Sequence, residues 1–149
     1  MECEIKLFGL SANNKLARAV AEELHQPLSQ IDIQRFADGE IYERVLESVR
    51  GDDVYIVAPI AEEVNDAFME IMIVIDALRR ASAGQINVVI PYLGYARQDR
   101  KAKSREPITA KMVASMLEMN GVDRVVAIAE NADCEPVVCL NKCDLDPAD

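Results

Sequence analysis

Short apolar runs alternate with longer amphipathic segments along most of this chain, and this alternation restricts the folds that it can adopt. The strand-like runs occupy residues 5–8, 31–35, 41–46, 54–58 and 86–92. Apolar residues recur at helical spacing over 11–24, 65–83 and 107–119. Strands that alternate with helices of about 10–15 residues favour right-handed crossovers. We therefore predict an α/β fold: a single doubly wound, mainly parallel sheet with helices on both faces, as in half of a Rossmann-like fold.

Residues that commonly begin and end helices mark the predicted helix boundaries. Ser, Thr, Asn and Asp side chains cap helix N-termini, proline is tolerated in the first turn, and glycine often follows the last turn. The predicted boundary residues are Ser11 or Asn13 for the first helix, Asn65 or Asp66 at the start and Gly84 at the end of the second, and Pro107 or Thr109 at the start and Gly121 past the end of the third.

The second predicted helix is apolar nearly all round. A helix of this kind must be covered on more than one side. A chain of this size has few layers with which to cover it, so we expect the helix to lie in the core and to take part in a contact between subunits of a homo-oligomer. Its apolar residues are Phe68, Ile71, Met72, Ile75 and Leu78 on one face and Met69 and Ile73 on the other.

Composition and charge exclude several classes of protein. The chain has 149 residues, half of them apolar, which suffices for one hydrophobic core. Its formal net charge is −10 and it has no tryptophan, so nucleic acid is not an expected partner. No apolar run approaches the ~20 residues that a membrane span needs, and the acidic start MECEIK is unlike a signal peptide. We therefore expect a cytoplasmic protein that does not bind membranes.

The cysteines are spaced unlike a disulfide framework or a zinc site. None of Cys3, Cys134, Cys139 and Cys143 forms a CxxC pair, and the only histidine, His25, lies far from three of them in sequence. Reduced thiols are expected, as in an intracellular protein, and no bound metal is predicted.

A basic segment directly follows the strand predicted at 86–92. It reads YARQDRKAKSREP over residues 95–107 and concentrates positive charge in an acidic protein. Open α/β sheets bind anionic ligands beyond the carboxyl ends of their strands. The segment therefore predicts a site for a nucleotide or another ligand with several phosphates, although an isolated basic run is also typical of a solvated loop.

Four motifs occur in an order that is characteristic of one enzyme family. They are RFADGE (35–40), ESVRGDDVYIV (47–57), VNDAFMEIMIVIDALRRASA (64–83) and INVVIPYLGYARQDRKAKSREPITAK (86–111). Together they resemble the amino-terminal domain of ribose-phosphate pyrophosphokinase, over about residues 6–127. The resemblance implies a phosphoribosyltransferase-like fold and a part in nucleotide biosynthesis. In that family ATP, with magnesium bridging its phosphates, donates its β,γ-diphosphoryl group to ribose 5-phosphate, so the implied ligand is Mg-ATP.

The resemblance also implies a set of ATP-binding residues. A guanidinium can both stack on a purine and fork onto phosphate oxygens. Without the resemblance, a phenylalanine beside a turn is more often a hydrophobic plug, and Asp-Gly is an ordinary turn signal. The implied residues are Phe36, Asp38 and Glu40, which would hold the adenine across a subunit boundary, Arg97 and Gln98, which would meet the nucleotide from the other side, and Lys101 and Arg105, which would face the phosphates.

A second, weaker site is implied in the ESVRGDD stretch. Ser48 and Arg50 match family positions that help to form a regulatory phosphate or nucleotide site between subunits. The same residues are also typical of a plain loop before a strand.

The chain departs from the family after about residue 127, within the stretch that follows the third predicted helix. The family has an Asp-Leu-His signature there, whose histidine helps to hold magnesium and acts in catalysis, whereas this chain reads VVAIAENAD over 125–133. The second α/β domain of the family, which binds the ribose phosphate, has no counterpart in the sequence. Diphosphoryl transfer depends on positioning and charge neutralisation around a metal. We therefore expect no catalytic residue and no turnover from this chain alone, and synthesis only when a second domain or chain complements it.

The last part, AENADCEPVVCLNKCDL (129–145), resembles a different family. Asn141, Lys142 and Asp144 form an NKxD pattern similar to the guanine-specificity motif of circularly permuted ribosome-assembly GTPases. Neither GxxxxGKS nor GxxxxGKT occurs in the sequence, so the phosphate loop of such enzymes is missing. Two family fragments joined without a linker predict a chimera, engineered rather than recombined, with a domain over 1–129 and a tail over 130–149.

The junction restricts the last strand. If residues 124–129 form a strand, residues 130–136 are too few for a helical crossover, which takes about a dozen. Either a strand at 137–140 returns antiparallel, or residues 122–133 form a helix as in the GTPase family. Adjacent valines at 125 and 126 favour the strand, so we predict a strand followed by an antiparallel or irregular tail.

Three functions of different classes remain open from the sequence. The favoured one is a catalytically incomplete, ATP-binding domain. The second is a structural or designed protein with no ligand, and the third is a guanine-nucleotide module.

Overall fold

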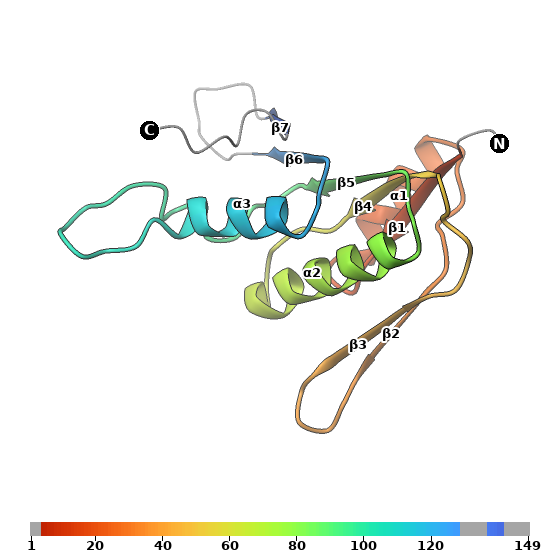
Figure 1. Cartoon of the computed structure of the whole chain (residues 1–149), viewed down its shortest axis with the longest axis horizontal. Helices are drawn as coiled ribbons and strands as arrows, with labels where there is room; N and C mark the ends of the chain where they lie inside the picture. Colours follow the sequence, from red (N-terminus) through yellow and green to blue (C-terminus); the bar gives the residue numbers. More distant parts are fainter. Residues whose placement is uncertain (1–3, 129–136, 142–149) are drawn as a thin grey trace.

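The computed structural model of the chain describes residues 4–128 and 137–141, which form a five-stranded sheet, a separate two-stranded hairpin and three helices (Figure 1). The sheet has the strand order β1-β4-β5-β6-β7, and its first four strands are parallel. The predicted α/β fold with a mainly parallel sheet is confirmed. In chain order the elements are β1 (Ile5–Gly9), α1 (Asn14–Glu23), β2 (Ile31–Arg35), β3 (Ile41–Val45), β4 (Asp53–Val57), α2 (Val64–Arg80), β5 (Gln85–Ile90), α3 (Thr109–Met119), β6 (Arg124–Ile128) and β7 (Val137–Asn141).

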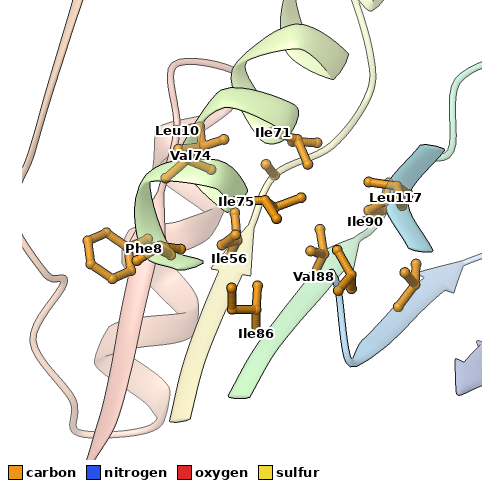
Figure 2. Packing of buried hydrophobic residues seen from close by; sticks show 14 of the residues in the cluster. Phe8, Leu10, Ile56, Ile71, Val74, Ile75, Ile86, Val88, Ile90 and Leu117 are labelled. Carbon is orange, nitrogen blue, oxygen red and sulfur yellow. The ribbon is translucent and has the colours of Figure 1, made fainter. Parts of the chain in front are cut away.

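Helices cover both faces of the main sheet. On one face, Phe8 and Ile56 belong to a buried cluster with Ile75 of α2, and α3 contributes to the same cluster (Figure 2). Neighbouring residues of a strand point to opposite faces, and on the other face Leu7 and Val57 pack against α1. Each aliphatic side chain buried in this way contributes about 1.5–3 kcal/mol of transfer free energy. The prediction of helices on both faces is confirmed.

β2 and β3 form an antiparallel hairpin outside the main sheet (Figure 1). A two-stranded hairpin alone is marginally stable in water, so it needs a surface on which to pack. Ile31, Ile33 and Val45 of the hairpin pack against the main core cluster, and β3 contacts α2. Both strands lie where the sequence predicts them, and the sequence alone does not reveal that they pair with each other outside the main sheet.

The predicted helix caps are confirmed only in part. Asn13 caps α1, because its Oδ1 accepts a hydrogen bond from the N–H of Leu16 over 3.3 Å. The cap predicted for α2 is wrong. The helix begins at Val64, and Asn65 and Asp66 lie inside its first turn, where their side chains bind groups on other elements instead of the helix N–H groups.

Gly84 does not end α2 as predicted. The helix ends at Arg80, and Ser82, with a φ of 64°, takes the left-handed conformation that follows it. Gly84 meets a different requirement, since a Cβ at this position would lie 2.7 Å from the main-chain oxygen of Gly51. The main chain before β4 therefore approaches the main chain before β5 more closely than any side chain would allow.

The last elements follow two of the sequence predictions. α3 begins at Thr109, and Gly121, with a φ of 93°, lies past its end. β6 is a strand, and β7 pairs with it antiparallel, with Arg124 opposite Asn141. The antiparallel alternative is thus confirmed, and the helical alternative is wrong for the residues of β6, while residues 129–136 lie outside the described ranges.

Candidate functional site

The tip of the β2–β3 hairpin presents Phe36 to solvent. Main-chain hydrogen bonds from Phe36 N to Glu40 O (2.9 Å) and from Gly39 N to Phe36 O (3.0 Å) close the turn, with Gly39 at a φ of 95°. The Phe36 side chain is 54% exposed and meets Tyr42 edge-on, with the ring centroids 6.2 Å apart. Phe36 is therefore not buried as a hydrophobic plug, and its ring is accessible to a flat ligand.

The two acidic residues of the hairpin tip are also exposed. Asp38 Oδ1 accepts a hydrogen bond from the N–H of Glu40 over 3.1 Å, a local bond of the kind that stabilises turns. Both residues remain open to solvent. The tip thus offers carboxylate acceptors within a few residues of an accessible aromatic ring.

The loop between β5 and α3 exposes a concentration of positive charge. Its main chain is fixed by Glu106, whose Oε2 accepts hydrogen bonds from the N–H groups of Ala102 (3.1 Å) and Lys103 (2.8 Å). Across residues 4–128 and 137–141, no ion pair includes a basic side chain of this loop. The charge is therefore available to an anionic ligand. The exposed basic residues are Arg97, Arg100, Lys101, Lys103 and Arg105.

Gln98 has a structural role that the sequence does not reveal. Its Oε1 accepts a hydrogen bond from Thr109 Oγ1 over 2.5 Å, and its main-chain oxygen accepts one from the N–H of Ala110 over 3.1 Å. These bonds satisfy groups in the first turn of α3. At the start of the loop, the Tyr95 hydroxyl donates to Asn65 Oδ1 of α2. The basic loop is thus attached to α2 and to α3.

A single chain does not bring the two predicted groups of ATP-binding residues together. Figure 1 shows the β2–β3 hairpin and the loop before α3 on different sides of the molecule. The predicted adenine residues and the predicted phosphate residues therefore form two separate surfaces.

A cavity of about 300 Å³ lies beyond the carboxyl ends of β1, β4 and β5. Asn13, Pro59 and Tyr92, each a few residues past one of these strands, are among its lining residues. Ligands of open α/β folds commonly bind at this edge. None of the predicted ATP-binding residues lines this cavity, nor the cavity of about 670 Å³ at the start of β1.

Arg35 attaches the hairpin to α2, and the sequence prediction did not include it. Its Nη1 lies 2.5 Å from Asp66 Oδ2, and its Nη2 lies 3.2 Å from Glu70 Oε1. Glu70 is buried, and its Oε2 accepts a hydrogen bond from the N–H of Ser11 over 3.1 Å. The hydrogen bond to Asp66 raises the pKa of Arg35 above its ordinary value. The signal for this contact in the sequence was the spacing of Asp66 and Glu70, four residues apart on one helix face. Only the fold shows that Arg35 of the RFADGE motif lies beside both carboxyl groups.

Ser48 and Arg50 lie on an exposed loop before β4. Val49 between them is buried, and the N–H of Gly51 donates to the main-chain oxygen of Ser82 over 2.9 Å. These contacts pack the loop on the end of α2. Both side chains are open to solvent, which an anion site would require, and the regulatory site stays a prediction.

The remaining sequence predictions fall at the end of the chain. Asn141 is the last residue of β7, and Lys142 and Asp144 lie outside the described ranges, as do Cys134 and Cys143. In the part of the chain that the structure describes, no group of three or more His, Cys, Asp and Glu residues could hold a metal ion. No helix in this part is long and apolar enough to cross a membrane.

Comparison with known proteins places this chain in one family. The sequence model of the N-terminal domain of ribose phosphate pyrophosphokinase matches residues 5–121. Ribose-phosphate pyrophosphokinase 1 of Streptococcus agalactiae serotype III is 53% identical over 124 residues, which are 83% of this chain and 38% of that protein. The ribose-phosphate pyrophosphokinase of Fusobacterium nucleatum is 53% identical over 129 residues, which are 87% of this chain and 41% of that protein.

A solved structure gives the same result for the fold. The phosphoribosylpyrophosphate synthetase from Mycobacterium smegmatis superposes with a TM-score of 0.82 at 41% sequence identity, over 87% of this chain and 44% of that chain. This chain thus spans about two fifths of the length of the curated relatives that it matches.

Proposed function

Because the chain belongs to the family of the N-terminal domain of ribose-phosphate pyrophosphokinase, we propose that it is an ATP-binding domain that does not catalyse phosphoribosyl pyrophosphate synthesis on its own. ATP would bind between two copies, with the hairpin tip of one copy against the adenine and the basic loop of the other against the phosphates. A homo-oligomer in the cytoplasm is therefore part of the proposal.

One observation supports this arrangement above the others. The chain carries an exposed aromatic ring with acidic neighbours at one place. At another, on a different side of the molecule, it carries an exposed group of cations that form no ion pair within the described ranges. A purine binds through stacking and through its amino group, whereas a triphosphate binds through cations. The hairpin tip thus matches the purine, and the basic loop matches the phosphates.

The proposed residue roles follow from their chemistry. Phe36 would stack on the adenine, and the carboxylates of Asp38 and Glu40 would accept hydrogen bonds from its amino group. Arg97 would approach the purine from the other subunit. Gln98 has its Oε1 engaged with Thr109, so its amide N–H groups are what it can offer a nucleotide. Lys101 and Arg105 would bind the phosphates, and Ser48 with Arg50 would form a second anion site.

The described residues do not fit a resident magnesium ion. They contain no group of three or more possible ligands, and the sequence over 125–133 has no histidine. Magnesium would therefore enter with ATP, bound to its phosphates. No catalytic step is assigned to residues of this chain.

ATP binding is tested by calorimetric titration of the whole chain with Mg-ATP, Mg-GTP and ribose 5-phosphate, with sedimentation measured in parallel. We expect the wild type to release or absorb heat on binding Mg-ATP. In both Phe36→Ala and Arg105→Ala the affinity for Mg-ATP should fall at least about tenfold, because each substitution removes one half of the site. Arg18→Ala, which removes an exposed arginine of α1, is the matched control and should bind normally. Absence of Mg-ATP heat at millimolar ligand would contradict the proposal.

Mixing the two variants provides a sharper test of the shared site. If each site uses the hairpin of one copy and the loop of another, an equimolar mixture of Phe36→Ala and Arg105→Ala chains should regain part of the lost binding, since some sites contain neither substitution. No recovery in mixtures that have been shown to exchange subunits would place both groups in a site within one chain.

The absence of turnover is tested with Mg-ATP and ribose 5-phosphate together. We expect no AMP formation, and synthesis of phosphoribosyl pyrophosphate by the chain alone would overturn this part of the proposal. Synthesis after addition of the remaining part of a relative would instead show that the chain works as a complementing half.

The family model does not extend to the last residues of the chain, and we propose that the chain is a chimera. The family model stops at residue 121, and the matched relatives cover 124 and 129 of the 149 residues. We propose that residues 1–129 form the domain and 130–149 a tail of different origin. A preference for GTP that Asp144→Ala abolishes would support the guanine-nucleotide alternative in place of ATP, and no heat with either nucleotide would support a purely structural protein.

A further inference from the structure

The inward face of the hairpin is apolar except at two positions. In the antiparallel register, Ile31 lies opposite Val45 and Ile33 lies opposite Glu43. Because side chains alternate along a strand, these four residues share one face, which is the face packed toward α2. The exposed Tyr42 and Arg44 of β3 belong to the opposite face. An acidic side chain is thus placed among aliphatic ones, and Arg35 is the other polar residue on this face.

Arg35 is already bound to other carboxylates. Its guanidinium contacts Asp66 and Glu70 of α2, at 2.5 and 3.2 Å. Glu63, next to the start of α2, adds a further negative charge near Arg35. One cation therefore serves several acidic groups, and no ion pair with Glu43 is found in the described part of the chain.

Glu43 is buried without a partner. The residue is 9% exposed, and both carboxyl oxygens lack a hydrogen-bond partner among the described residues. A buried ionised carboxylate that has no hydrogen bond is strongly unfavourable, and the usual outcome is that it takes up a proton. Burial first, and then the nearby Glu70 carboxylate, raise the pKa of Glu43 to about 8.

We propose that Glu43 is a proton-binding latch, which holds the β2–β3 hairpin against α2 when it is protonated and lets the hairpin open when it is ionised. This proposal rests on the packing of the hairpin and on the buried, unpartnered Glu43, and it does not depend on the ATP-binding proposal. Its hinge lies where the strands leave the body of the protein, between the main-chain bond from Leu46 N to Gln30 O (3.0 Å) and the bond from Ser29 N to Leu7 O (2.7 Å).

The direction of the pH effect follows from linkage. In the open hairpin Glu43 is solvated and has the ordinary carboxyl pKa, and in the docked hairpin its pKa is about 8. At pH values between these two pKa values, Glu43 holds a proton in the docked hairpin and loses it in the open hairpin. The equilibrium constant for opening the hairpin therefore rises with pH, by up to about tenfold per pH unit. Above about pH 8 both forms are ionised and the opening constant becomes level.

Amide hydrogen exchange of the whole chain, between pH 5.5 and 9, tests this latch. After correction for the intrinsic exchange rate, the protection of residues 31–45 should fall by up to about tenfold per pH unit until about pH 8. In Glu43→Gln the amide stays neutral at every pH, so hairpin protection should not follow pH. Glu43→Leu is the second variant, and it should behave in the same way if the glutamine variant folds poorly.

Asp32→Asn is the matched control. It removes the same charge from the same hairpin at a position that lies opposite Arg44, on the outward face. This control should keep the pH dependence of the wild type. Hairpin protection that is independent of pH in the wild type, or that depends on pH equally in Glu43→Gln, would overturn the latch.

Discussion

At the scale of single residues, Arg35 attaches the hairpin to α2 by two ion pairs. Glu70 is 1% exposed, and its partners are Arg35 and the N–H of Ser11. Replacing Arg35 by methionine keeps most of the aliphatic stem but leaves a buried carboxylate without its cation. We expect the free energy of unfolding to fall, by less than for a fully buried pair because Arg35 is partly exposed. Urea denaturation measures this loss.

Arg80→Met is the control for the arginine substitution. Arg80 also pairs with a carboxylate, Asp76, but on the exposed surface of α2, where such a pair contributes little to stability. The double variant Arg35→Met with Glu70→Met should recover part of the stability lost in Arg35→Met, because no buried charge remains. Equal losses in Arg35→Met and Arg80→Met would show that the contact with Glu70 contributes little.

Single residues were predictable from the sequence where their role is local. The sequence offers Ser11 or Asn13 as the cap of the first helix, and Asn13 can be a candidate because the N–H that it binds is three positions away. Asn65 and Asp66 were assigned the same role, but partners from distant segments take up their side chains. Gly84 is predicted to end α2, which is wrong, and the contact that requires a glycine there, the main chain of Gly51, is equally distant in sequence.

At the scale of elements, the basic loop is held to α3 by the hydrogen bond between Gln98 and Thr109. Thr109→Val keeps the shape of the side chain and removes this bond, so we expect the loop to open more often. A loss of about 1 kcal/mol corresponds to cleavage by trypsin about fivefold faster at the basic residues of 97–105. Timed digestion followed by mass spectrometry measures the rates.

Thr109→Ser serves as the control, because it retains the hydroxyl and should be cleaved at a rate close to that of the wild type. Equal acceleration in both variants would show that the effect is not specific to loss of the hydroxyl. No acceleration in Thr109→Val would show that the loop is held by other contacts.

Strands and helices were predictable as elements because apolar periodicity is a local property. Their pairing was predictable only where chain length restricts it: the short connection before β7 left an antiparallel return as the consistent choice for a strand, and the structure has it. No such restriction applies to β2 and β3. Their departure from the main sheet depends on the surface of α2, which a pattern along the strands does not describe.

At the scale of the whole molecule, Glu43 makes stability fall as pH rises. Its native pKa, about 8, lies above the ordinary carboxyl value, so between the two the native state binds a proton that the unfolded state does not. The free energy of unfolding therefore decreases across this range and becomes level above about pH 8. Urea denaturation from pH 5 to 9 should show the wild type losing stability relative to Glu43→Gln. A constant difference between the two proteins would contradict this assignment.

The proposed ATP site was predictable as a list of residues but not as a place. Phe36 and Arg105 come from motifs that the sequence displays directly, whereas their separation on different sides of one chain is a property of the fold. The family resemblance supplied the idea of a subunit boundary, and composition or periodicity could not have done so. Gln98 shows the same limit, since its motif does not show that its side-chain oxygen is already in use.

The antiparallel pairing of β7 has a consequence for any attempt to restore synthesis by adding the remaining part of a relative. β7 occupies the hydrogen-bonding edge of β6 that faces away from β5. An incoming polypeptide that extends the sheet at that edge has to displace β7 first, because each edge pairs with one strand at a time. A chain that ends before residue 137 would lack β7 and leave this edge of β6 unpaired. The added polypeptide could then pair with β6 directly, without displacing another strand.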